Sequence, residues 1–172
     1  MKNNKLILKF QIISTIFVIA AGILLHFTFE WTNENIFAGI FSAVNESTWE
    51  HLKLVFFPML ITTIAGYYLL GDNIICAKTI GAITAMLLTV VLFYTYTGII
   101  GTNYASINIG IFIIAVVIGE YIAYRIMKTG RSYKSSICTI ILIILAISFV
   151  IFTYNTPKIN LFKDPVTGRY GI

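Results

Sequence analysis

Hydrophobic residues are concentrated in five long stretches, separated by short polar segments. The stretches cover residues 6–29, 52–70, 74–100, 107–127 and 137–154. Each approaches or exceeds the roughly 20 residues that an α-helix needs to cross the hydrocarbon core of a bilayer. Strand-like alternation is weak, and a backbone in lipid must satisfy its own hydrogen bonds, so helices are favoured over a barrel. The pattern predicts an all-α integral membrane bundle of about five transmembrane helices, in one domain covering residues 1–172.

Two segments outside these stretches also have a readable pattern. Between the first two, apolar residues recur at helical spacing and predict a short interfacial or re-entrant helix within 33–44; they are Ile36, Phe37, Ile40, Phe41 and Val44. After the fifth, the tail 155–172 contains Asp164, Pro165 and Gly168, which favour a tight turn. We expect the tail to lie along the membrane interface; the alternative is a lid over other polar residues.

Composition excludes an ordinary water-soluble domain. Of the 172 residues, 58% are hydrophobic and 11% are charged, against roughly 25% charged residues in soluble domains. The net charge of +5 comes from basic residues near the ends of the apolar stretches, without the aromatic-interleaved basic stripe of a nucleic-acid-binding surface. The expected partner is therefore the lipid bilayer and not nucleic acid, while a homo-oligomer or a membrane-protein partner stays open.

Charge placement predicts the orientation, because basic residues are retained on the cytoplasmic side. With the N-terminus inside, eight basic residues are cytoplasmic and four are external. The cytoplasmic ones are Lys2, Lys5, Lys9, Lys78, Arg125, Lys128, Arg131 and Lys134, and the external ones are Lys53, Lys158, Lys163 and Arg169. Four acids lie in or beside the first external loop: Glu30, Glu34, Glu46 and Glu50. We predict a multi-pass protein of the cell membrane with a cytoplasmic N-terminus and an external C-terminus.

The densest polar cluster is the segment Asn-Glu-Ser-Thr-Trp-Glu-His-Leu-Lys at residues 45–53. Ser47 and Glu50 have the spacing of a capping box, so part of the cluster serves to start a helix. His26 and Glu30, four residues apart, share one helix face at the predicted outer end of the first span. The candidate ligand-binding residues are His26, Glu30, Glu46, Trp49, Glu50, His51, Lys53 and Glu120.

Convergence of the first two spans would bring imidazole and carboxylate groups together. These are ligands of zinc, iron and manganese, so a divalent metal is the candidate cofactor. The candidate metal ligands are His26, Glu30, Glu46, Glu50 and His51. The alternative is a hydrogen-bonded cap in which Glu46 or Glu50 pairs with Lys53 and a carboxylate satisfies His26.

Buried-type residues within the spans raise three further expectations. Glu120 lies inside an apolar stretch, where a carboxylate needs a partner such as Tyr124, a basic residue on another helix or a functional role. Cys76 and Cys138 lack the spacing of a metal or redox motif and are expected to be separate, small buried residues. Small residues let membrane helices approach closely, and the candidates for such contacts are Gly66, Gly81, Gly110 and Gly119.

The segments 45–53 and 161–171 together resemble a family of short multi-pass membrane proteins of unknown function from Gram-positive bacteria. The second segment reads Leu-Phe-Lys-Asp-Pro-Val-Thr-Gly-Arg-Tyr-Gly. The resemblance covers nearly the whole chain. It implies a bacterial plasma membrane and brings no assigned activity.

Three functions fit these observations. The first, which the sequence favours, is binding or transport of a small ligand or ion at the outward-facing polar cluster. The second is a metal-dependent membrane enzyme that acts on a lipid or envelope substrate, and the third is a structural subunit of a membrane complex. The chain has no glycine-rich phosphate loop and no G-x-S-x-G elbow, which removes support for phosphoryl transfer and serine hydrolysis.

Overall fold

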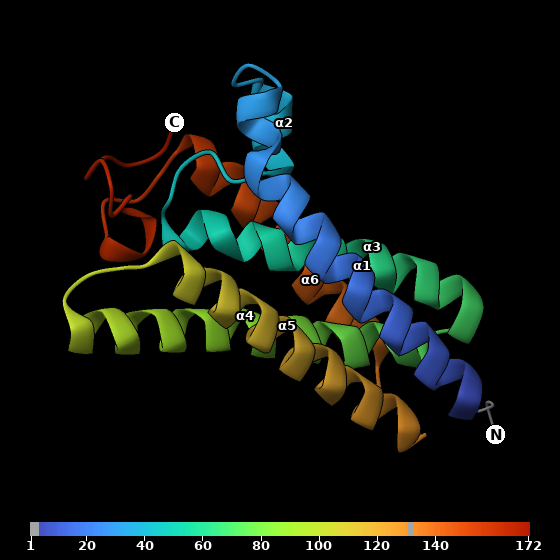
Figure 1. Cartoon of the computed structure of the whole chain (residues 1–172). Helices are drawn as coiled ribbons and strands as arrows, with labels where there is room; N and C mark the ends of the chain where they lie inside the picture. The colour runs from blue at the N-terminus through green and yellow to red at the C-terminus, as the bar shows by residue number, and fades with distance from the viewer. Residues whose placement is uncertain (1–3, 131–132) are drawn as a thin grey trace.

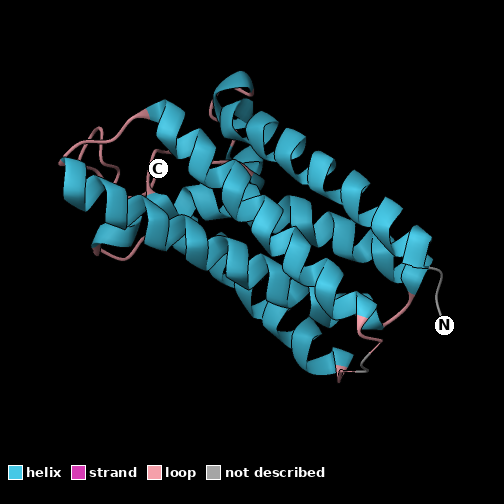
Figure 2. Cartoon of the chain, turned by 60° about the horizontal axis from the view of Figure 1, so that its bottom comes forward, coloured by secondary structure: helices cyan, strands magenta, loops and turns pink. Residues whose placement is uncertain are grey.

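The computed structural model describes residues 4–130 and 133–172, and over these ranges the fold is all-α, with no β-strand (Figures 1 and 2). The elements are α1 (Asn4–Trp31), α2 (Ile36–Phe41), α3 (Thr48–Leu70), α4 (Asn73–Ile100), α5 (Ala105–Lys128), α6 (Ser135–Tyr154) and the 3-10 helix η1 (Asn160–Phe162). All except α2 and η1 are long and apolar enough to cross a membrane. The predicted fold class is confirmed, including the short helix after the first span.

Four of the long helices form a ring, in the order α1, α3, α4 and α5, and α5 returns to contact α1. Helix α6 lies outside this ring and packs against α4 and α3. The loops gather at the two ends of the bundle (Figure 2). We call the end that holds α2 and the chain's C-terminus the tail end, and the opposite end, where α1 begins, the N-terminal end (Figure 1).

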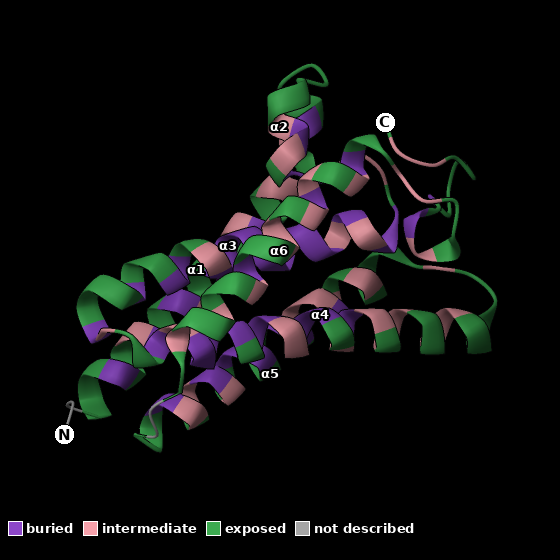
Figure 3. Ribbon diagram, turned by 180° about the vertical axis from the view of Figure 1, so that it is seen from behind, coloured by how far each residue is buried: buried purple, intermediate pink, exposed green. Residues whose placement is uncertain are grey.

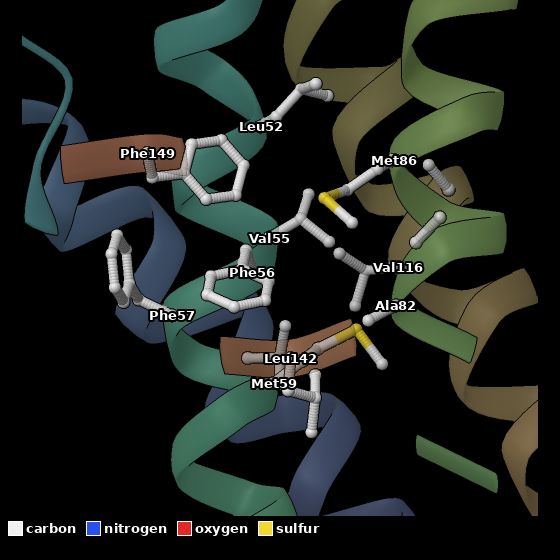
Figure 4. Packing of buried hydrophobic residues seen from close by; sticks show 13 residues of the cluster. Leu52, Val55, Phe56, Phe57, Met59, Ala82, Met86, Val116, Leu142 and Phe149 are labelled. Carbon is white, nitrogen blue, oxygen red and sulfur yellow. The ribbon is translucent and has the colours of Figure 1, made fainter. Parts of the chain in front are cut away.

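Helix α3 contributes most to the hydrophobic core. Val55 and Phe56 of α3 are fully buried, and Figure 4 shows Val55 pointing toward Met86 of α4 and Val116 of α5. The exposed residues lie mainly on the outward sides of α1, α5 and α6 (Figure 3), and many are large and apolar, such as Ile16 and Ile144. Apolar side chains on an outer face belong against lipid tails, which agrees with membrane-spanning helices.

A glycine contact lets α4 and α5 pack closely. A Cβ atom added to Gly81 would lie 2.5 Å from the carbonyl oxygen of Gly119, and the reverse substitution meets the same obstacle. Gly66 also lies against side chains, those of Ile74 and Phe10. Gly110 differs from the expectation, since nothing lies within 4 Å of the place its Cβ would take.

Next to the glycine contact lies a buried polar cluster. Nζ of Lys78 on α4 is 2.7 Å from both carboxylate oxygens of Glu120 on α5, and the two side chains are 0% and 1% exposed. Gln11 and Ser14 of α1 donate hydrogen bonds to the same carboxylate. Glu120 therefore has the basic partner on another helix that its burial requires, and Lys78 is a buried residue of the bundle, not the cytoplasmic charge we expected.

Lys53, expected as an external charge, is also buried and paired, with Nζ 2.5 Å from Glu50. Without Lys53 and Lys78, the basic residues divide seven to three instead of eight to four. Of the seven, Lys2 and Arg131 lie outside the described residues. The imbalance still favours a cytoplasmic N-terminus.

The expectation of two separate cysteines was wrong. Cys76 and Cys138 form a disulfide that joins the beginning of α4 to the beginning of α6 at the N-terminal end. The two cysteines are 62 positions apart in the sequence, and all of α5 lies between them. The bond links the beginning of α6, the long helix outside the ring, to the beginning of α4, which is part of the ring.

Candidate functional site

His26, Glu46 and His51 come together at the tail end of the bundle. One potential ligand atom of each lies within 4.8 Å of those of the other two. Nε2 of His26 is 3.6 Å from Oε1 of Glu46, and Nε2 of His51 is 3.5 Å from Oε2 of the same carboxylate. Three of the five predicted metal ligands therefore meet, and they come from the end of α1, the linker before α3 and the first turn of α3.

The start of α3 fixes two of these residues. Ser47 is the N-cap, and its hydroxyl accepts a hydrogen bond from the Glu50 amide. Asn45 accepts a hydrogen bond from the Ser47 amide, 2.8 Å away, which shapes the linker on either side of Glu46. One turn into the helix, Nδ1 of His51 lies 2.9 Å from the Ser47 carbonyl oxygen. This end of α3 is therefore held by local hydrogen bonds that do not involve the Glu46 carboxylate.

The separations between these groups suit a metal ion better than direct hydrogen bonds, which are usually about 2.7–3.2 Å long. Two ligands on a tetrahedral zinc, each at about 2.0–2.1 Å from the metal, lie about 3.4 Å apart. The contacts of Glu46 with the two imidazoles are close to that spacing. Nδ1 of His26, the ring nitrogen that does not face Glu46, is buried without a hydrogen-bond partner among the described residues.

Electrostatics favour the ionised form of Glu46. The imidazole of His26, whose Nε2 lies 3.6 Å from Oε1 of Glu46, holds the pKa of the Glu46 carboxyl below its usual value, against the opposite effect of partial burial, and charge on His51 acts in the same direction. Metal binding needs a deprotonated carboxylate. The carboxylate is therefore ready to serve as a ligand near neutral pH.

A cavity of about 460 Å³ adjoins the three residues, which form part of its lining. Its walls come from α1, α3, α4 and α5 and from the tail, and they are mostly apolar, as in Leu54 of α3 and Phe112 of α5. Small-molecule sites commonly have volumes of about 300–1,000 Å³ and apolar walls with a few polar groups. His26, Glu46 and His51 are the titratable members among the described residues that line it.

The tail closes one side of this cavity, through Pro165 and Val166. Asn45 donates a hydrogen bond to the Gly171 carbonyl oxygen, and Phe162 of η1 packs against Trp49, with ring centroids 4.8 Å apart. The tail therefore lies against the polar cluster, as the lid alternative supposes, and its position along the membrane interface stays a prediction.

Asp164 organises the turn of the tail. Its carboxylate accepts hydrogen bonds from the Val166 amide and the Thr167 hydroxyl. Burial raises the pKa of this carboxyl, but these hydrogen bonds and one from the Glu46 amide together lower it below its usual value. The same side chain thus links the tail to the backbone of a candidate ligand.

Glu50 and Lys53 belong to a separate structural cluster. Besides the ion pair, Lys53 donates to the Gly39 carbonyl oxygen at 2.7 Å and to Thr153 at 3.0 Å. Glu50 accepts from the Val44 amide at 3.1 Å and from Thr153 at 3.2 Å. These contacts join α2, α3 and α6, as the hydrogen-bonded cap alternative supposed for Glu50, and they leave Glu50 outside the metal-ligand group.

The other candidates also lie elsewhere. Glu30 is exposed on α1 and is absent from both the ligand group and the cavity lining. Trp49 packs against Phe149 and Phe162, and Glu120 is in the buried cluster with Lys78.

Sequence reasoning missed several residues that the structure brings to these sites. Thr153, Gln11 and Ser14 are buried polar partners of the ion pairs, and Asn103 and Asn108 line the cavity. Single polar residues in apolar stretches were the available signal, since such residues usually face a bundle interior. The stretches did not show which helix each one faces.

Comparison with known proteins assigns the chain to a family. A family model described as "Family of unknown function (DUF6512)" matches residues 1–172. The chain belongs to DUF6512. No curated protein and no solved structure matches this DUF6512 chain. Like the family that the sequence resembles, DUF6512 covers the chain and has no assigned activity. The function is therefore argued from the site.

Proposed function

We propose that this DUF6512 protein binds a divalent transition-metal ion through His26, Glu46 and His51 and holds a small ligand against that ion in the adjoining cavity. The observation that carries the proposal is the meeting of three ligand atoms, from three separate segments, within 4.8 Å at the cavity wall. This develops the ligand-binding function that the sequence favoured and gives the binding site a metal.

The hydrogen bonding of His51 supports the proposal. A carbonyl oxygen only accepts, so Nδ1 of His51 donates its proton to Ser47, and Nε2 keeps a lone pair directed toward Glu46. Metal-binding histidines usually donate their second ring nitrogen in this way, which fixes the tautomer and the orientation of the ring. Glu30 and Glu50 are no longer proposed as ligands.

A metal-dependent enzyme is the second candidate, and the number of protein ligands favours it. Two histidines and one glutamate are a ligand set of catalytic zinc sites, which keep a fourth position open for water or substrate. A metal in such a site polarises a bound carbonyl or phosphoryl oxygen, or lowers the pKa of a bound water. The cavity would supply the dry, shaped space that this chemistry needs.

The test is elemental analysis of the purified protein in detergent, after equilibration with zinc and removal of free metal. We expect about one zinc per chain in the wild type and loss of at least nine tenths of it in His26→Ala, Glu46→Gln and His51→Ala. The matched control is Glu30→Gln, which alters an acid on the same face of α1 as His26 and should keep its zinc. Circular dichroism checks that each variant remains helical.

Either of two results would overturn the proposal. The first is a wild type without zinc under these conditions, and the second is equal zinc content in the wild type and the three ligand variants. A loss of zinc in Glu30→Gln equal to that in His26→Ala would show that general charge, rather than this ligand set, holds the metal.

We further propose that the protein is located in the cell membrane, with its N-terminus cytoplasmic. The five apolar helices support the membrane location, and the seven-to-three division of basic residues supports the orientation. The tail end, with the site, then faces the outside of the cell.

A further inference from the structure

The cavity beside the proposed metal site has two chemically different parts. Its lining includes Asn103, just before α5, and Asn108, in the first turn of α5, and both residues carry hydrogen-bonding side chains. Away from them the lining is apolar, with Ile111 and Phe112 of α5 prominent. A ligand that satisfies both parts needs a polar group at one end and a hydrocarbon portion at the other.

The cavity also reaches the lipid-facing surface of the bundle. Ile23 of α1 and Ile109 of α5 both line it, yet they are 41% and 53% exposed. They lie on the same two helices as Ile16 and Ile114, whose exposed side chains have the apolar character of a lipid-facing surface. These exposed wall residues mark the side between α1 and α5 as the place where a molecule dissolved in the bilayer would enter the cavity.

Close packing between α1 and α5 at Gly22 limits how far this opening extends toward the N-terminal end. A Cβ atom on Gly22 of α1 would lie 2.4 Å from Cζ of Phe112 and 2.7 Å from the carbonyl oxygen of Leu54. The aromatic ring thus fills the space that a larger residue at position 22 would take, and α1 and α5 are in contact there. The opening is therefore limited to the part of the α1–α5 groove on the tail side of this contact.

The charge of the loaded site selects the polar group of the ligand. A divalent ion with neutral His26 and His51 and ionised Glu46 leaves one net positive charge, and the rest of the described lining contains no titratable group. Zinc-type ions also accept an oxygen ligand in the position that three protein ligands leave open. A singly charged anionic oxygen group complements that charge.

We infer that the ligand is an anionic amphiphile taken from the bilayer, whose hydrocarbon chain enters the cavity between α1 and α5 while its charged oxygen group binds the metal held by His26, Glu46 and His51. This inference rests on the proposed metal site. To that site it adds the chemical class of the ligand and the route by which the ligand enters the cavity.

The experiment uses the full chain in lipid nanodiscs of uncharged lipid, loaded with cobalt(II), whose visible absorption changes when a new oxygen ligand enters its coordination shell. The probes are dodecanoate, acetate and dodecanol. We expect dodecanoate to change the spectrum at concentrations at least about tenfold lower than acetate, because burial of even a few methylene groups contributes that much. Dodecanol, which has the chain without the charge, should leave the spectrum unchanged at the same concentrations.

Two matched variants separate the cavity from general membrane effects. Ala105→Phe adds an aromatic ring to the cavity lining, and Ala20→Phe adds the same ring at an exposed position of α1 outside the lining. Ala105→Phe should keep its cobalt and weaken the dodecanoate response about tenfold or more, while Ala20→Phe should behave as the wild type.

The outcomes distinguish this inference from the proposed function. A protein that binds no cobalt overturns the metal site and the inference with it. Cobalt bound normally, with acetate as effective as dodecanoate or with no difference between the two alanine variants, leaves the metal site standing and overturns the amphiphile. A dodecanol response equal to that of dodecanoate overturns the role of the anionic oxygen.

Discussion

Nδ1 of His51 lies 2.9 Å from the carbonyl oxygen of Ser47, the residue that caps the same helix. Ser47 therefore does more than cap α3: its carbonyl oxygen occupies one ring nitrogen of His51 and leaves the other free to bind a metal ion. The available one, Nε2, lies 3.5 Å from Glu46. The candidate site is thus oriented by a backbone atom that no side-chain substitution removes.

Metal removal should destabilise the protein through this site. Binding to the folded state at a free metal concentration of 100 times the dissociation constant contributes about 2.7 kcal/mol. We therefore expect a chelator to lower the melting temperature of the zinc-equilibrated wild type in detergent and to leave that of His51→Ala unchanged. Equal effects of the chelator on both proteins would contradict the prediction, and Glu30→Gln provides the control that should respond as the wild type does.

Breaking the buried ion pair from one side should cost more than removing both partners. Glu120→Ala leaves the fully buried Lys78 ammonium unpaired, which typically costs about 3–5 kcal/mol. The double variant Lys78→Met with Glu120→Leu should lose clearly less, because apolar residues of similar volume replace the pair. The free energy of unfolding in detergent measures both losses. Strict additivity of the single variants Lys78→Met and Glu120→Leu in the double variant would show that the groups do not interact.

The glycine contact between α4 and α5 should tolerate no methyl group. Gly119→Ala brings its Cβ to 2.5 Å from the Gly81 carbonyl oxygen, and overpacking of this kind typically costs about 1–3 kcal/mol. Gly110→Ala, in the same helix with open space around it, should be neutral or stabilising by up to about 1 kcal/mol, given the helix propensity of alanine. Thermal unfolding of the two variants side by side tests the difference; similar melting temperatures would be the contrary result.

Protonation or removal of the Asp164 carboxylate should release the tail. Because hydrogen bonds hold its pKa below the usual value in the folded protein, the stabilisation is fully present above about pH 4 and is lost as the pH falls through the folded pKa. Asp164→Asn should give the released state at neutral pH. Fluorescence of Trp49, which packs against Phe162, reports release in a Trp31→Phe background.

The control for the tail experiment is Asp72→Asn, which alters an exposed acid at the opposite end of the bundle. Its fluorescence should match that of the parent protein across the pH range. A parent protein and an Asp164→Asn variant with identical fluorescence at neutral pH would mean that the carboxylate does not anchor the tail.

The orientation can be decided with reporter fusions. Because the basic residues outside the buried pairs divide seven to three in the predicted topology, we expect a fusion to residue 172 to be active with alkaline phosphatase, which folds outside the cytoplasm, and a fusion of green fluorescent protein there to be dark. The disulfide gives the opposite indication, since it lies at the N-terminal end and disulfides persist mainly in oxidising compartments. The reverse fusion result would place that end, with the disulfide, outside.

The length of the hydrophobic stretches was enough to predict the helices, because crossing a bilayer sets both their length and their internal hydrogen bonding. The same reasoning brought His26 close to Glu46 and His51, since successive spans place their facing ends at one surface. It could not assign Lys78, because a lysine near a helix start resembles an ordinary loop charge until the rotation of α4 toward Glu120 is known. The disulfide and the closing tail depend on contacts between segments far apart in the chain, for which local spacing gives no signal.

The part that Pro165 and Val166 play in the cavity wall has a consequence for biosynthesis. Along the chain these residues follow all five long helices, so this part of the cavity wall is the last to be synthesised. Until the tail folds back, the lining lacks Pro165 and Val166 on that side. The proposed metal site would be more open to solvent until the tail lies against it.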